Sequence, residues 1–530
     1  MGKSFYLLSV FLCFVILPAC NSNTENIDGD LDSEVQDAEE TELDGDLEAE
    51  VDIDGDIEED FEQESPLVYN WPKCAQLQTN KTLAEKAAYF DKVAKERHIA
   101  PDGLIRNIYL NDDLESVKHY YHVPSTMLWT GMYLASQAFR YAVTKDETIL
   151  DTARLLLEGL HQNMKVTGHK GLYGRSHSRP DVTYGNDTTN NWDWADSPAE
   201  GYEGWRFNFD VSKDSYDGLF FGYAIAWQLF DDAQIKSDIA NRLQELMDEF
   251  VGNGLQIKDY INDPAGVVTE HGRLMATAGD DWPGFNALLA SSWVKTSQVA
   301  LDDQGLDDFY YGCLMGMRED VDCPEIDDPT MMQLLKIESY VDAMEQPLFE
   351  LFTPDCDQNY DSFDMCYQAI YPLITFEKDP QLKARFIDVM KNKLFHTDDP
   401  QYQSIATYGN AYFTFSYAGL SGDDPEEDQV LSDAVDLAIC VLKEFPEEKF
   451  KRYIPKGEQE VACTNRLNKP TSAERIPLAE YDFDNYLWRL DFFEIVQNEI
   501  PEDKQMVYSP EDFLIAYWMA RYHNIISEDM

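Results

Sequence analysis

Apolar residues recur at three- and four-residue steps through most of the chain after Leu83, which is the spacing of amphipathic helices. Segments that alternate like β-strands are nearly absent, and no 34-residue repeat of the tetratricopeptide kind is visible. The pattern therefore predicts an all-α fold. The helices are expected at residues 84–95, 125–143, 148–164, 214–229, 232–251, 286–300, 330–344, 364–373, 382–394, 401–417, 428–444, 491–496 and 510–525.

Residues 1–19 have the features of a secretory signal peptide. Lys3 supplies a positive end, and the apolar run of about a dozen residues that follows is too short to span a bilayer. Leu17-Pro18-Ala19-Cys20 resembles a bacterial lipobox, and this resemblance implies a lipidated, palmitate-bearing N-terminus at Cys20. An ordinary signal peptide with a chance cysteine is the alternative. Because Asn21 follows instead of Asp, the resemblance favours the outer membrane or the cell surface.

Residues 20–65 form an acidic linker. Its segment 21–65 carries 21 Asp and Glu residues and no Lys or Arg. Like charges with little to bury predict an extended, disordered tether. The run 52–56, Asp-Ile-Asp-Gly-Asp, also permits a calcium interpretation, although its spacing does not match an EF-hand loop. The remaining residues, 66–530, are expected to form one helical domain.

The whole chain has 100 Asp and Glu against 41 Lys and Arg, a net charge of −59. A charge of this sign repels phosphate backbones, so we expect no nucleic-acid partner. Membrane contact is expected through the lipid anchor only. Nucleotide-binding, zincin and serine-hydrolase motifs are absent, and we predict neither a cofactor nor a metal.

Three pairs of cysteines are close in sequence, and an exported protein permits disulfides between them. Spacing does not fix the connectivity, so local pairing is a hypothesis. The candidates are Cys313 with Cys323, Cys356 with Cys366, and Cys440 with Cys463, which leaves Cys74 unpaired.

Short patterns along the body resemble a known architecture. They are Trp129–Ala135, the run Gly171-Leu172-Tyr173-Gly174-Arg175-Ser176, Asp214–Tyr223 and Phe513–His523. Together they resemble hairpins of the α/α toroid found in six-hairpin glycosidases and related secreted bacterial proteins, over roughly residues 83–526. The resemblance implies a ring of helical hairpins with a funnel at one end. It includes no diagnostic catalytic signature, and fold alone does not fix function.

Asp214 and Asp217 form the best carboxylate pair for such a funnel. They lie three residues apart at a predicted helix start, with Tyr216 between them. Glycoside hydrolysis requires a proton-donating carboxylic acid and a second carboxylate, so both are candidate catalytic residues. Two carboxylates on one turn are close together, and the partner can come from another hairpin. Helix capping is the alternative role of these residues.

Further candidates for binding a sugar or an anion lie on the loops before predicted helices. The long segment 168–213 is rich in aromatic and cationic residues, and such a loop is often functional. Each residue also has a structural interpretation, such as pairing with nearby acidic residues. The substrate-binding candidates are Arg175, His177, Trp205, Tyr216, His271, Arg273, Trp488 and Arg489.

The leading prediction is a lipid-anchored cell-envelope protein whose toroid accommodates an oligo- or polysaccharide, with a glycoside hydrolase-like activity. The alternative is a non-catalytic binding or envelope-scaffold lipoprotein of the same fold. An enzyme should have carboxylates across the funnel, one of them with a raised pKa because of burial.

Overall fold

The computed structural model describes residues 81–122, 125–185, 193–260, 268–274, 283–323, 339–346, 348, 360–396, 405–425, 427–464, 469–472, 476–477, 480–481 and 492–528. The chain divides into two compact units, Met1–Leu67 and Val68–Met530, and the description below concerns the second. Cys20, the signal segment and the acidic linker lie outside the described residues.

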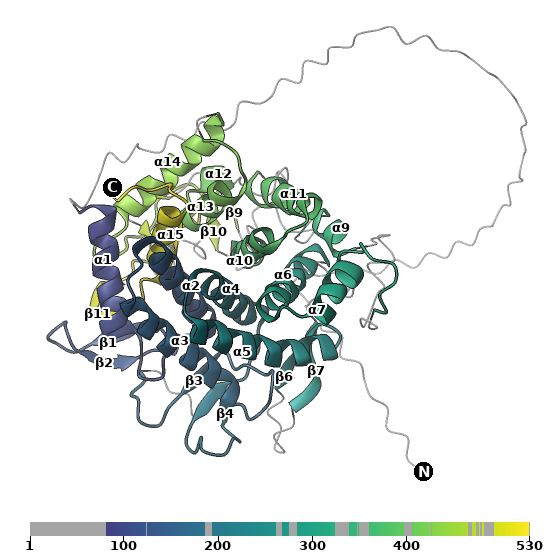
Figure 1. Cartoon of the computed structure of the whole chain (residues 1–530). Coiled ribbons are helices and arrows are strands. Elements are labelled where there is room, and N and C mark those ends of the chain that lie inside the picture. The colour runs from purple at the N-terminus through teal and green to yellow at the C-terminus, as the bar shows by residue number, and fades with distance from the viewer. Residues whose placement is uncertain are drawn as a thin grey trace, which may run out of the picture. The chain divides into compact units, whose positions relative to one another are not determined.

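The body is an α/α toroid, as the sequence predicted. Its inner helices follow one another round a ring, each packed against the next, and the last closes on the first (Figure 1). They are α2 (Thr126–Thr144), α4 (Lys213–Leu229), α6 (Pro283–Leu301), α10 (Tyr360–Phe376), α13 (Ala411–Leu420) and α15 (Glu511–Tyr522).

Other helices pack outside this ring, and several of them run between two inner helices in the chain order. Their polar faces are exposed to solvent and their apolar faces pack inward. This amphipathic pattern is the one from which the sequence predicted them. They are α1 (Leu83–Val93), α3 (Thr148–Lys165), α5 (Ala233–Gly252), α7 (Gln304–Asp308), α9 (Tyr340–Met344), α11 (Pro380–Val389), α12 (Ile405–Tyr408) and α14 (Gln429–Glu444), with π-helical turns at Ala94–His98, Phe309–Leu314 and Met390–Phe395.

The closest contact in the ring joins α2 to α4. A Cβ atom added at Gly218 would lie 2.7 Å from the Cα of Leu128, and one at Gly222 would lie 2.6 Å from the carbonyl oxygen of Gly131. Only glycine fits where two backbones approach this closely. This contact fixes the position of Asp217, the residue before Gly218.

Short antiparallel strands occur in the connections that lead into inner helices, where the sequence predicted irregular loops. One sheet has the order β2-β1-β11-β8, another β3-β5-β4, and two are hairpins, β6 with β7 and β9 with β10. The strands are β1 (Ile108–Leu110), β2 (Val117–Tyr120), β3 (Ser176–Ser178), β4 (Trp194–Asp196), β5 (Arg206–Asn208), β6 (Gln256–Tyr260), β7 (Val268–Leu274), β8 (Phe450–Lys451), β9 (Cys463–Thr464), β10 (Pro470–Thr471) and β11 (Asp503–Val507).

Most predicted helices are confirmed within a few residues, with two corrections. Of the predicted helix 330–344, residues 330–338 lie outside the described residues, and its end is helical as α9. The predicted helix 401–417 is divided into α12 and α13 at Gly409, whose φ of 79° is left-handed. The predicted helix 491–496 is wrong in its described part, because Phe492 and Phe493 form a turn and Glu494 makes a β-bridge with Thr471.

No helix in the described part of the chain is both long enough and apolar enough to cross a membrane.

Candidate functional site

Asp214 lies in the first turn of α4, at the end of the ring where the strand-bearing loops enter the inner helices; we call this end the mouth. Its Oδ2 accepts a hydrogen bond of 2.7 Å from the Ser125 hydroxyl and lies 3.5 Å from Arg175 Nη2. The same guanidinium donates to Ser125 Oγ at 2.8 Å and forms an ion pair of 2.9 Å with Asp210. The Asp214 side chain is 24% exposed, so this carboxylate reaches solvent. The predicted residues Arg175 and Asp214 therefore lie together.

Asp217 lies one turn deeper on the same helix and is only 1% exposed. Its Oδ1 accepts a 2.9 Å hydrogen bond from Trp293 Nε1 on α6, and its Oδ2 has no hydrogen-bond partner among the described residues. Burial raises the pKa of Asp217 well above its usual value, the Trp293 bond opposes this, and the charge of Asp214 adds to it. Burial therefore favours the protonated form of this carboxyl.

Aromatic rings fill the ring interior one turn beyond Asp217. Phe221 of α4 lies 6.0 Å from the Tyr371 ring on α10 and 6.2 Å from the Tyr412 ring on α13. Phe139 of α2 reaches Tyr371 from the other side, at 5.8 Å. These side chains fill the ring interior beyond Asp217, on the side away from the mouth.

Asp364 on α10 is a buried carboxyl that the sequence analysis did not select. It is 6% exposed, and its charge, together with that of Asp217, acts on the Cys366 thiol and the Tyr412 hydroxyl, whose pKa values are raised mainly by burial. A signal was available, because Asp361-Ser362-Phe363-Asp364 repeats the pattern of Asp214-Ser215-Tyr216-Asp217.

Two predicted ligand-binding residues are enclosed in the fold. His177 on β3 is fully buried, and its Nδ1 pairs with Asn163 Oδ1 at 2.7 Å. The Tyr216 hydroxyl accepts from the Tyr173 amide at 2.9 Å and donates to the Gly171 carbonyl at 3.0 Å. Both side chains bind the loop to the ring of helices, and neither is exposed to a ligand.

Trp205 is partly buried beside this loop. The Arg179 guanidinium lies 5.3 Å from the centre of its ring system, a cation–π contact, and His177 lies 5.5 Å away. Of the other predicted residues, His271 and Arg273 lie on β7, where the side chains are not among the described parts, and Trp488 and Arg489 lie outside the described residues.

A second polar cluster, which we call the Arg106 cluster, lies under the β3–β5 sheet. Arg106 is fully buried and donates to Asp102 Oδ2 at 2.8 Å, to the His177 carbonyl at 2.8 Å and to Ser176 Oγ at 3.2 Å. Tyr184 also donates to Asp102 Oδ2, at 2.8 Å. Through these hydrogen bonds the cluster fixes the position of the loop that carries Arg175 relative to the segment before α2.

The disulfide between Cys313 and Cys323 is confirmed. The pairing of Cys356 with Cys366 is wrong, because Cys366 is a free thiol buried in the ring on α10. Cys440 and Cys463 are each disulfide-bonded. Cys74 and Cys356 lie outside the described residues.

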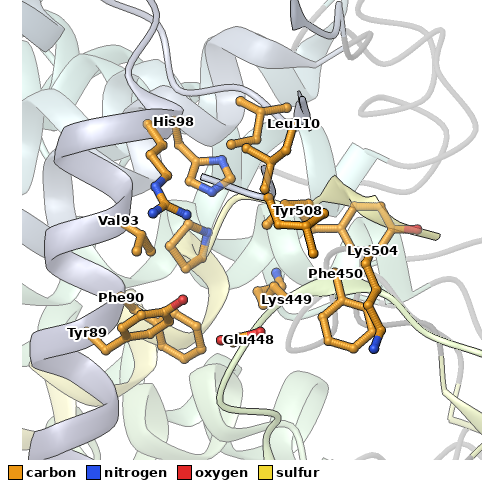
Figure 2. Close-up of a pocket in the computed structure, with 15 residues that line it drawn as sticks. Tyr89, Phe90, Val93, His98, Leu110, Glu448, Lys449, Phe450, Lys504 and Tyr508 are labelled. Carbon is orange, nitrogen blue, oxygen red and sulfur yellow. The ribbon is translucent and has the colours of Figure 1, made fainter. Parts of the chain in front are cut away.

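A pocket of about 100 Å³ lies away from these residues, lined by side chains of α1, β1, β8 and β11. Figure 2 shows His98, Lys449, Phe450 and Tyr508 among the side chains around it. Its two buried polar side chains are committed to the fold: Lys449 contacts both oxygens of Asp512 at 2.9 and 2.8 Å, and His98 contacts the Arg106 carbonyl at 2.8 Å. None of the predicted site residues lines this pocket.

No family model matches the chain, and no curated protein matches it. Several solved structures are similar. An unsaturated glucuronyl hydrolase specific for heparin has a TM-score of 0.38 and 9% identity, over 84% of this chain and 96% of its own. A family 76 α-mannanase of Bacteroides thetaiotaomicron has a TM-score of 0.38 and 11% identity over the same shares. A metagenome-derived family 9 endoglucanase has a TM-score of 0.38 and 13% identity, over 82% of this chain and 81% of its own.

Proposed function

We propose that this protein is a glycoside hydrolase-like enzyme that binds a glycan at the mouth of the ring, with Asp217 as the proton donor. The observation that carries the proposal is the state of Asp217: it is buried, accepts one neutral hydrogen bond, and has no cation paired with it among the described residues. A carboxyl that keeps its proton at neutral pH is what the departing glycosidic oxygen requires.

Asp214 and Arg175 would form the entrance to this site. The carboxylate of Asp214 is partly exposed and hydrogen-bonded by Ser125, which suits it to accept hydrogen bonds from sugar hydroxyls. Arg175 fixes its orientation and also holds Asp210. In this arrangement Asp214 orients the sugar and Asp217 delivers the proton.

The experiment is release of new saccharide ends from a broad polysaccharide panel by the purified chain. Asp217→Asn should abolish release, and Asp214→Asn should reduce it. Asp436→Asn, which changes an exposed carboxylate on α14, is the matched control and should leave release unchanged. Release that is equal in the parent and in Asp217→Asn would contradict the assignment of the proton donor.

A non-catalytic glycan-binding role is the second candidate. The observation that favours it is the near-complete burial of Asp217, which is also compatible with a structural carboxylic acid. A binder would retain a polysaccharide in affinity electrophoresis and release no saccharide ends, and the Asp217→Asn variant would bind equally well.

We also propose that Cys20 is lipidated and that the body is held at the outer membrane or cell surface by the acidic linker. The lipobox-like sequence supports this proposal, and the Cys313–Cys323 disulfide is typical of a protein outside the reducing cytoplasm. Cys20→Ser should move the protein from the membrane fraction to the soluble fraction and remove incorporation of labelled palmitate. Unchanged fractionation and labelling would contradict lipidation at this residue.

A further inference from the structure

The pattern Asp-Ser-aromatic-Asp occurs twice in the chain, at the start of two inner helices. It is Asp214–Asp217 at the start of α4 and Asp361–Asp364 at the start of α10. The last three positions match in burial as well as in sequence. The serines Ser215 and Ser362 are buried, the aromatic residues Tyr216 and Phe363 are buried, and the final carboxyls Asp217 and Asp364 are buried.

The ring brings the two copies together. α4 and α10 contact each other directly in the ring, although residues 230–359 lie between them in the sequence. The Asp217 and Asp364 carboxyls are both electrostatic neighbours of the Cys366 thiol and of the Tyr412 hydroxyl, which places the two carboxyls around the same buried groups.

Gln368, one turn after Asp364 on α10, gives this region a second distinctive feature. It is 1% exposed, and neither its amide nitrogen nor its amide oxygen has a hydrogen-bond partner among the described residues. Buried polar atoms are normally paired, so Gln368 and Asp217 Oδ2 together supply unpaired groups suited to a hydroxyl-rich ligand.

Glycoside hydrolysis needs carboxyl groups on two sides of the bond that breaks. Asp214 and Asp217 lie three residues apart on one helix and therefore flank one side of the ring interior. Asp364 comes from a different helix, so it can lie across the substrate from Asp217.

We propose that Asp364 is the partner carboxylate of Asp217, so that the active pair spans α4 and α10. This inference rests on the function proposed above. In the reaction, Asp217 gives its proton to the glycosidic oxygen as the bond between that oxygen and the anomeric carbon breaks. Asp364 takes a proton from the water whose oxygen bonds to the same carbon. One water is consumed, and the proton returns from Asp364 to Asp217 through solvent.

Azide rescue tests this role, because a small anion can replace the activated water when the general base is removed. The parent chain, Asp364→Ala, Asp217→Ala and the control Asp436→Ala are assayed on aryl glycosides of common hexoses and hexuronic acids. Each sugar is used with a good leaving group, 2,4-dinitrophenol, and with a poor one. Circular dichroism and thermal melting of every variant confirm folding.

Asp364→Ala should lose about 10²–10⁴-fold in rate with both leaving groups, and added azide should restore the rate and yield a glycosyl azide. Asp217→Ala should keep most activity on the dinitrophenyl glycosides and lose it on the poor leaving group, because only the latter needs a proton. Asp436→Ala should behave like the parent.

A folded Asp364→Ala that is as active as the parent, or one that is inactive and yields no glycosyl azide, would overturn the assignment while leaving the proposed function intact. A parent that cleaves no glycoside or polysaccharide would overturn both. Where alanine prevents folding, the isosteric Asp364→Asn is assayed in the same way, and parent-level activity in that variant has the same contrary meaning.

Discussion

Asp102 and Asp217 are both buried aspartates near the mouth of the ring, 5% and 1% exposed, and they have opposite electrostatic surroundings. Asp102 accepts hydrogen bonds from the Arg106 guanidinium and the Tyr184 hydroxyl, both at 2.8 Å. Asp217 accepts one hydrogen bond, from the Trp293 indole. Burial raises the pKa of both. At Asp102 the charges of Arg106 and His177, with the hydrogen bonds from Arg106 and the Leu104 amide, together outweigh burial, so its pKa is lowered, whereas that of Asp217 is raised.

The difference separates a structural carboxylate, Asp102, from Asp217, which we propose takes part in catalysis. In the Arg106 cluster, the cost of burying charge is offset by a fixed counter-charge, so the aspartate stays ionised and holds two loops together. Among the described residues no cation is paired with Asp217, so burial favours its protonated form. A buried carboxyl that is paired with a cation is therefore compatible with a purely structural role. A buried carboxyl without a paired cation is the stronger candidate for a functional residue.

The largest expected effect is on stability and comes from Arg106→Met. Removing the guanidinium leaves Asp102 as an uncompensated buried charge, which should lower the free energy of unfolding by about 3–5 kcal/mol. Urea denaturation measures this loss. The matched control is Arg154→Met on α3, whose side chain is 43% exposed in its ion pairs; it should cost at most about 1 kcal/mol. Equal losses of stability in Arg106→Met and Arg154→Met would contradict the claim that Asp102 depends on Arg106 as its buried counter-charge.

Asp217→Asn should show the reverse profile, with a large loss of activity and a small change in stability. Asparagine is neutral like the protonated aspartate and keeps an oxygen for Trp293, so at about pH 4 and below the free energy of unfolding should change by no more than about 1 kcal/mol. Hydrolysis should fall by about 10²–10⁴-fold. A loss of stability comparable to that of Arg106→Met would show that Asp217 is ionised and structural.

The pH dependence of stability should have opposite signs at the two sites. The folded-state pKa of Asp102 is lowered, so its contribution is present above its unfolded pKa and is lost as pH falls. The folded-state pKa of Asp217 is raised, so its contribution is present below the unfolded pKa and is lost as pH rises. Relative to the parent, Asp217→Asn should gain stability between about pH 4 and pH 7, at up to about 1.4 kcal/mol per pH unit. Denaturation at several pH values checks this, and a flat difference would contradict it.

The smallest expected effect on stability is that of Arg175→Gln at the mouth. Its ion pairs with Asp210 and Asp214 are partly exposed, so the free energy of unfolding should fall by about 1 kcal/mol or less. Because Asp214 loses its orientation, KM for a glycan should rise more than kcat falls. An unchanged KM would remove Arg175 from the substrate-binding role.

The sequence was sufficient for the helices and for the placement of Asp214 and Asp217 at a helix start, because both depend on local periodicity and spacing. The closed ring came from the resemblance. The sequence could not show that His177 is enclosed, because that depends on its hydrogen bond with Asn163 on α3 and on the antiparallel pairing of its own strand, β3, with β5, which residue spacing does not predict. Asp364 was missed although its tetrapeptide repeats that of Asp217. The two Asp-Ser-aromatic-Asp patterns can be assigned to one site only because α4 and α10 contact each other in the fold.

Infrared difference spectroscopy measures directly whether Asp217 carries a proton at neutral pH. We expect the parent at neutral pH to have a protonated carboxyl C=O band that is absent from Asp217→Asn and unchanged in the control Asp436→Asn. Asp91 and Glu511, whose pKa values burial raises to about 6 and about 7, contribute equally to all three spectra and cancel. A difference spectrum that instead shows loss of an ionised carboxylate band would contradict the account and identify Asp217 as a structural anion.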